Sequence, residues 1–180
     1  MSELKELLDR YGNPCDESKF ASISDDIWQL GDIKKIKDSV SDEIFTFFVA
    51  INLIGNWQCG GWGFIFCEMR SLLPYAGGAL AKLGLDELVT AFENTQKIFP
   101  DFAKECDEST YVDVINFLLN PKFKVSNTRL NAISTDDRLK MSQMYHKNIQ
   151  ILDDLSESFW GYGTPHDGFG GVVEYIKRAK

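Results

Sequence analysis

Histidine and cysteine most often supply a nucleophile or a metal ligand, and this sequence has few of either. It holds two histidines, His146 and His166, and four cysteines, none in the Cys-x-x-Cys spacing of zinc ribbons and redox motifs. Cys59 or Cys67 could pair with His166 as a nucleophile and its base. Both cysteines lie in or beside an apolar stretch, which raises the pKa of a thiol and leaves it unreactive. We therefore expect reduced, mostly buried thiols.

Carboxylates and glycines give no clearer sign of catalysis. Asp153, Asp154 and Glu157 share a face of a predicted helix, a spacing that suits a weak cation site but is far more often a solvated surface. The glycine-rich segment 161–171 follows a predicted helix and not a strand, so it is expected to be a tight connection rather than a phosphate-binding loop. The GxSxG, GxxxxGK[ST] and HExxH motifs are missing from the sequence. The sequence thus predicts no catalytic residue, no cofactor, no metal site and no enzymatic activity.

The elements that must position any site are organised around residues 39–70. The run from Ile44 to Ile54 is apolar on every side when wound as a helix, which is typical of a buried helix. Ser39 or Ser41 is the expected N-cap. The pair Gly60-Gly61 predicts a tight corner, followed by a second buried helix packed back on the first. The predicted fold class is all-α, a single compact multi-helix domain around a buried central helix pair.

Tryptophans flank this predicted corner. Trp57 precedes the glycine pair and Trp62 follows it. Aromatic side chains at such a corner could line a ligand pocket. They could equally fill the space between two closely packed helices, which is the more ordinary role of buried indoles.

The remaining segments mostly show helical periodicity. Residues 31–38, with Lys34, Lys35 and Lys37, are expected to be a solvated segment, and 123–125 a short extended piece. Residues 111–115 would suit a strand as well as a helix, and 135–159 could form one long helix or two with a break near Asn148. Further helices are expected over 2–11, 24–30, 86–99 with Asp86 as its cap, 110–119 with Thr110 as its cap, and 172–178.

Length and charge limit the class of protein. The 180 residues predict one domain over 1–180, with 1–38 as an N-terminal helical extension. The net charge of −8 argues against direct binding to nucleic acid or to an anionic membrane, and it permits a basic protein as partner. The charged N-terminus does not resemble a secretory signal, and the apolar run 44–54 is too short to span a bilayer. We therefore expect a cytoplasmic protein of unknown oligomeric state.

The segment Gly60-Gly61-Trp62, continuing through Phe66, resembles a bacterial family named after a DNA-mimic protein. The family pattern continues with an alanine- and leucine-rich segment leading to a glycine, here 79–84, and a helix ending in Phe-Pro, here Leu88 to Phe99-Pro100. The segments 152–159 and 175–176 are similar to its last two helices. The resemblance covers about 43–178 and is sharpest over 56–100. Cys59 stands where the family has asparagine, and Phe64 where it has glutamine.

The resemblance implies an all-α domain without enzymatic activity that presents carboxylates where DNA presents phosphates, so that a DNA-binding protein docks on it. Alternatives are an immunity-type protein that neutralises a toxin, and a small-molecule-binding or enzymatic domain that uses the Trp57–Trp62 region. Mimicry requires exposed acidic side chains with few intervening cations. The candidate partner-binding residues are Asp86, Glu87, Glu93, Asp101, Glu105, Asp107, Glu108, Asp153, Asp154 and Glu157.

Overall fold

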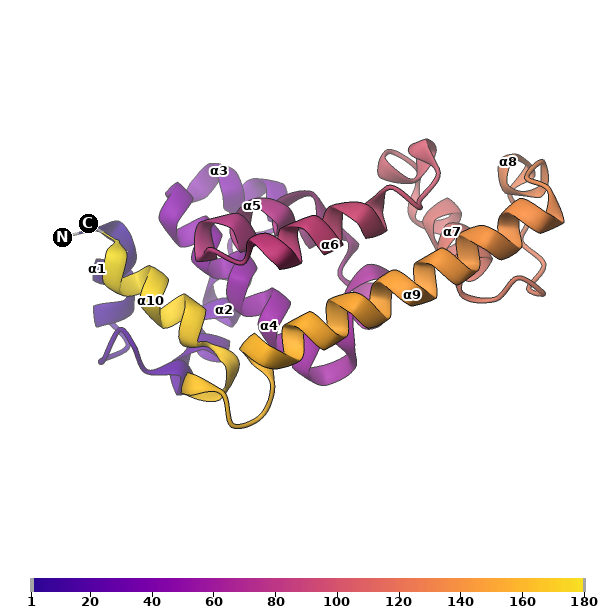
Figure 1. Ribbon diagram of the computed structural model, residues 1–180. Helices are drawn as coiled ribbons and strands as arrows, with labels where there is room; N and C mark the ends of the chain where they lie inside the picture. The colour runs from indigo at the N-terminus through magenta and orange to yellow at the C-terminus, as the bar shows by residue number, and fades with distance from the viewer. Residues whose placement is uncertain (1, 180) are drawn as a thin grey trace. The chain divides into compact units, whose positions relative to one another are not determined.

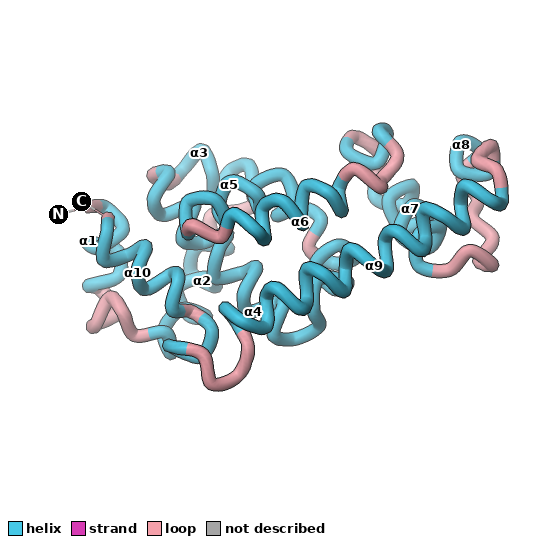
Figure 2. The backbone as a smooth tube through the Cα atoms, in the orientation of Figure 1, coloured by secondary structure: helices cyan, strands magenta, loops and turns pink. Residues whose placement is uncertain are grey.

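The computed structural model describes residues 2–179, and within them every regular element is a helix (Figures 1 and 2). The predicted all-α class is therefore confirmed. The α-helices are α1 (Glu3–Asp9), α2 (Phe20–Trp28), α3 (Ile33–Ser39), α4 (Asp42–Glu68), α5 (Leu73–Leu83), α6 (Asp86–Gln96), α7 (Glu108–Leu119), α8 (Thr128–Asn131), α9 (Thr135–Trp160) and α10 (Gly170–Arg178). Short 3₁₀ turns are η1 (Glu17–Lys19), η2 (Arg70–Leu72), η3 (Asp101–Lys104) and η4 (Pro165–Gly168).

The contacts between residues divide the chain into two compact units. The first unit comprises 2–89 and 155–179, and the second unit comprises Thr90–Asp154. Helices α6 and α9 each contribute residues to both units. The single-domain organisation expected from the chain length stays a prediction.

Helix α4 is the central element of the first unit, as its apolar sequence predicts. Its N-cap is Ser41, whose hydroxyl accepts from the Ile44 N–H at 3.4 Å, while Ser39 belongs to the preceding helix. Every residue from Ile44 to Ile51 is buried. Helices α1, α2, α3, α5 and α10 all pack against α4. Burial on all sides accounts for the lack of a polar face on this helix.

The predicted glycine corner is a kink inside α4. Gly61 has φ 69° and ψ −175°, a conformation that is essentially restricted to glycine. Helical residues continue beyond the kink to Glu68, and Trp62, Ile65 and Phe66 are buried there. Gly61 thus changes the direction of the helix between two buried segments.

The N-terminal extension belongs to the core of the first unit. Leu4 and Leu8 of α1 and Phe20 of α2 are almost fully buried. Helix α1 lies beside the end of α10, where Lys5 Nζ donates to the Ala179 carbonyl at 2.5 Å (Figure 1). The two ends of the described chain are therefore tied together within this unit.

The segment 31–38, predicted to be solvated, keeps its lysines exposed, but most of it forms helix α3, which also packs one residue into the core. Asp32 caps the helix by accepting from the Lys35 N–H at 2.9 Å, and Ile36 is fully buried. Three lysines stay exposed on the outer face while one apolar residue reaches the core. A high local charge therefore did not exclude a packed helix.

Other boundaries also differ from the sequence prediction. Segment 111–115 is helical, and α7 begins at Glu108 after the N-cap Asp107 rather than at Thr110. Asp86 is the first residue of α6 and not its cap, and α6 ends at Gln96, before the predicted 99. Helix α9 runs through Asn148 without a break. Residues 123–125 lie in a loop, and the glycine-rich segment contains η4 and the start of α10.

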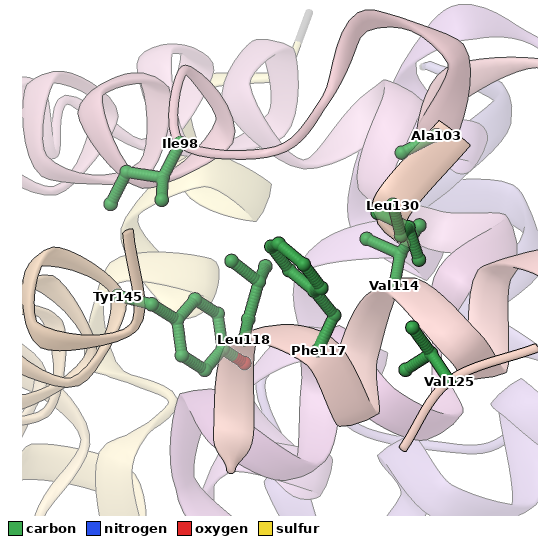
Figure 3. Close-up of a cluster of buried hydrophobic side chains, with 8 residues drawn as sticks. All are labelled: Ile98, Ala103, Val114, Phe117, Leu118, Val125, Leu130 and Tyr145. Carbon is green, nitrogen blue, oxygen red and sulfur yellow. The ribbon is translucent and has the colours of Figure 1, made fainter. Parts of the chain in front are cut away.

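The second unit has its own apolar core. Figure 3 shows Phe117 and Leu118 of α7 next to Tyr145 of α9, with Val114 of α7 close to Leu130 of α8. Ile98, Ala103 and Val125 complete the cluster. Because these residues come from α7, α8, α9 and the segments between them, the cluster holds the acidic segment 93–108 against the rest of the unit.

In the part of the chain that the structure describes, each helix is too short or too polar to cross a membrane.

Candidate partner-binding site

The predicted partner-binding carboxylates are nearly all at the surface. Nine of the ten are exposed, and Asp153 is half-buried. Three belong to the first unit, namely Asp86, Glu87 and Glu157, and the other seven to the second unit. The second unit therefore holds the larger group, which lies mainly on the segment from α6 to the start of α7.

The acidic segment 93–108 contains both structural and available carboxylates. Asp107 is the N-cap of α7 and accepts from the Thr110 N–H at 2.8 Å and from the Thr110 hydroxyl at 3.3 Å. Glu108 lies in the first turn of α7, where the helix dipole favours a negative charge. Local helix chemistry thus accounts for these two side chains without a partner protein.

Glu87 likewise lies in the first turn of α6, whereas Glu93, Asp101 and Glu105 lie outside the first turn of any α-helix. Six of the nine exposed candidates make no ion pair with lysine or arginine in residues 2–179: Glu87, Glu93, Asp101, Glu105, Asp154 and Glu157. An exposed carboxylate without an internal partner can pair with an incoming cation without first breaking a bond in its own protein.

One arginine from elsewhere in the second unit approaches the acidic segment. The guanidinium carbon of Arg129 lies 4.0 Å from the centroid of the Phe102 ring in η3, between Asp101 and Glu105 in sequence. Lys97 donates to Asn94 at 3.2 Å and not to a carboxylate. The acidic segment therefore has Arg129 engaged on an aromatic ring, two exposed lysines, Lys97 and Lys104, that form no ion pair, and carboxylates that remain open to solvent.

The second predicted acidic group lies on α9. Asp154 accepts from the Gln150 amide at 2.8 Å, one turn earlier on the same helix. Among residues 2–179, no group of three histidine, cysteine or acidic side chains is arranged to hold a metal ion. The Asp153, Asp154 and Glu157 triplet therefore does not form a cation site in the structure.

The tryptophans beside the Gly61 kink are packed in the core of the first unit. Trp62 is fully buried and donates through Nε1 to the Ser156 hydroxyl at 2.7 Å. The ring of Trp160 lies 5.9 Å from that of Trp62 and 5.8 Å from that of Trp57. The arrangement agrees with the packing interpretation, since the indoles fill the space beside the kink and join α4 to the end of α9.

The cysteines are more accessible than the sequence predicts. Cys59 is exposed, and Cys15, Cys67 and Cys106 are half-buried free thiols. Cys59 directly precedes the glycine pair at the kink. Burial raises the pKa of the Cys67 thiol, with a smaller contribution from the neighbouring Glu68. The expectation of mostly buried thiols is therefore wrong.

Each histidine contacts a different group. His166 Nδ1 lies 3.2 Å from Glu17 Oε2 in the first unit. His146 Nε2 lies 3.0 Å from the Leu119 carbonyl in the second unit.

The structure reveals one feature that sequence reasoning missed. Gln58 of α4 donates through Nε2 to the carbonyls of Trp160 and Asp167, which lie on either side of the loop between α9 and α10. This loop displays Tyr162, whose side chain is 96% exposed. The sequence Gly161-Tyr162-Gly163 was the one local pattern that could have indicated an exposed aromatic side chain on a loop.

Comparison of the chain with protein-family models, curated proteins and solved structures finds no match. The resemblance to the DNA-mimic family thus rests on the residues quoted for it and stays a prediction.

Proposed function

We propose that this chain is a non-enzymatic, cytoplasmic binding protein whose partner is a basic protein of the kind that binds DNA. One observation carries the proposal: Glu87, Glu93, Asp101 and Glu105 are exposed and make no ion pair with lysine or arginine in residues 2–179.

The chemistry of such a surface favours a cationic partner. Charges that are complementary across an interface steer association and exclude partners of the same sign. The net charge of −8 adds a long-range attraction for a basic protein. A partner's lysine or arginine would gain a carboxylate at these positions without displacing an internal cation.

Three of these carboxylates lie within one compact unit. Glu93, Asp101 and Glu105 belong to the second unit, where η3 and α7 contact one another over a shared apolar core. Because Ile98 and Ala103 of this segment are packed in the core, the backbone that carries the carboxylates is already ordered, which lowers the entropic cost of binding. A DNA-binding partner would then meet negative charges carried on an ordered backbone.

The test compares two variants with the same net charge. The site variant combines Glu93→Gln, Asp101→Asn and Glu105→Gln, and the control combines Asp9→Asn, Asp25→Asn and Asp38→Asn, all exposed in the first unit. A partner captured from host lysate is identified, purified and titrated against both variants at low and high salt, with and without duplex DNA.

The site variant should bind its partner about tenfold more weakly than the wild type does. It loses three surface ion pairs with the partner, and each contributes a few tenths of a kcal/mol to the binding free energy. The control should lose little, high salt should weaken binding, and duplex DNA should compete with the protein for its partner. Equal binding by the site variant and the wild type would overturn the proposal. So would binding that neither salt nor DNA changes.

A further inference from the structure

The loop between α9 and α10 is closed at both ends by one side chain. Gln58 Nε2 donates to the Trp160 carbonyl at 3.0 Å and to the Asp167 carbonyl at 2.7 Å. The bonds join residues that lie more than a hundred positions apart in sequence, all within the first unit. The loop of residues 161–167 therefore starts and ends at fixed points on the buried helix α4.

The loop's own backbone is held in an uncommon conformation. His166 and Asp167 are in the left-handed region, with φ of 56° and 49°, although neither is glycine. Such residues cost about 1 kcal/mol or more each and persist only where surrounding contacts hold them. Here the contacts are the Gln58 bond to Asp167 and the His166 approach to Glu17 at 3.2 Å.

Gly168 completes this anchoring by letting the backbone approach α4 closely. A Cβ at Gly168 would lie 2.5 Å from Gln58 Nε2 and 2.6 Å from the Trp160 carbonyl oxygen. Any larger residue would push the loop off the amide that holds it. The loop between α9 and α10 thus has a defined conformation that its contacts with Gln58 of α4 maintain.

What this loop displays is an aromatic ring. Tyr162 is 96% exposed, more than any other large hydrophobic side chain recorded as exposed in the described chain. On the same loop, Thr164 Oγ1 donates to the Gly161 carbonyl at 2.8 Å, so the backbone beneath the ring is also fixed. A tyrosine displayed on an ordered backbone provides a large contact area with only two side-chain torsions to fix, and tyrosines are frequent at binding hot spots.

The Glu157 carboxylate lies directly beside the backbone of Gly161, the residue that precedes Tyr162. The Glu157 side chain folds over Gly161, such that a Cβ there would collide with the carboxylate. Glu157 is exposed, and residues 155–176 of the first unit, which include the loop, hold three acidic side chains and no lysine or arginine. The loop therefore carries an exposed aromatic ring next to a carboxylate, and its own sequence contains no cation that would compete for that carboxylate.

We propose that Tyr162 and Glu157 form a receptor for one lysine or arginine side chain of a protein partner. The cation would lie over the tyrosine ring, whose face is negative, and pair with the Glu157 carboxylate. An apolar partner would have to desolvate Glu157 without compensation, and an acidic one would be repelled. This assignment rests on the proposed function, because it supplies one contact of the same basic partner.

The test uses a synthetic hexa-arginine peptide as probe, titrated at low ionic strength by NMR with the full chain. Tyr162→Phe keeps the ring, Tyr162→Ala removes it, and Glu157→Gln removes the charge. Phe123→Ala is the matched control, since Phe123 is another exposed aromatic residue but lies in the second unit between two lysines.

Tyr162→Ala and Glu157→Gln should each weaken binding about two- to fivefold, with Tyr162→Phe and Phe123→Ala unchanged. The amide signals of residues 157–163 should shift in the wild type. Wild-type affinity in Tyr162→Ala, no binding by the wild type, or an equal loss in Phe123→Ala would overturn the assignment.

The two proposals can fail separately, because their variants change different units. If the Glu93, Asp101 and Glu105 variant loses the partner while Tyr162→Ala binds hexa-arginine normally, the receptor is refuted and the proposed function stands. If Tyr162→Ala loses the probe while the triple variant keeps the partner, the receptor stands and the proposed function is refuted.

Discussion

Replacing Gly61 by alanine should destabilise the protein, because this residue makes the kink in the buried helix α4. Its φ of 69° and ψ of −175° lie in a region that is essentially restricted to glycine. An alanine held there would cost about 3 kcal/mol, at the upper end of the range for sparsely populated backbone regions. The smaller entropy of the unfolded alanine chain would return about 0.7 kcal/mol.

The net loss is therefore about 2 kcal/mol of unfolding free energy. For a chain of this size, this corresponds to a fall in Tm of roughly 4–8 °C. Thermal unfolding followed by far-ultraviolet circular dichroism measures the change, and urea unfolding gives the free energy independently.

Gly55→Ala is the matched control within the same helix. A Cβ at Gly55 meets nothing within 4 Å, and α4 is helical at that position. This substitution should stabilise the protein by about 0.5–1 kcal/mol, since alanine is the better helix former. The two glycine substitutions are thus expected to have opposite signs. If Gly61→Ala were as stable as Gly55→Ala, the kink would not need glycine and the reasoning would be refuted.

Three further predictions concern the two units, the thiols and a helix cap. All four tryptophans lie in the first unit, so urea unfolding followed by their fluorescence should coincide with circular dichroism if the chain is one cooperative domain, and separate midpoints would contradict this. Iodoacetamide at pH 8 should modify exposed Cys59 faster than Cys67, because the raised pKa of the Cys67 thiol leaves less thiolate at that pH. Site-resolved mass spectrometry measures both rates, and equal rates would argue against the burial of Cys67. Asp107→Ala should cost about 1 kcal/mol by removing the N-cap of α7, whereas Asp107→Asn should cost far less; equal losses in urea unfolding would show that charge and not capping matters.

The central helix could be predicted from sequence because its signals are local and agree with one another. An apolar run without a polar face, a serine before two acidic residues and a glycine pair all indicated where α4 begins and bends. Helix α3 was not predicted as a packed element, because its three lysines indicated only a solvated segment. The i, i+3 spacing of Ile33 and Ile36 was the correct sign, since one buried stripe suffices to pack a short helix.

The candidate site could be predicted only in part, because some of its contacts join residues that lie far apart in the sequence. That carboxylates lie at the surface follows from the cost of burying charge, and the structure bears this out for nine of the ten. The bonds from Gln58 to the α9–α10 loop join residues 102 and 109 positions apart. No local pattern encodes such a pairing, because it depends on how α9 and α10 pack against α4.

The departures from the family pattern acquire a physical meaning in the structure. Cys59 and Phe64, where the resemblance predicts polar residues, are both exposed, while Trp62 and Phe66 between and beyond them are buried. Relative to that pattern, this chain keeps the buried aromatic side chains beside the kink and differs at two positions that face solvent. Exposed side chains contribute little to a core, so cysteine and phenylalanine at these two positions are compatible with the kinked helix α4.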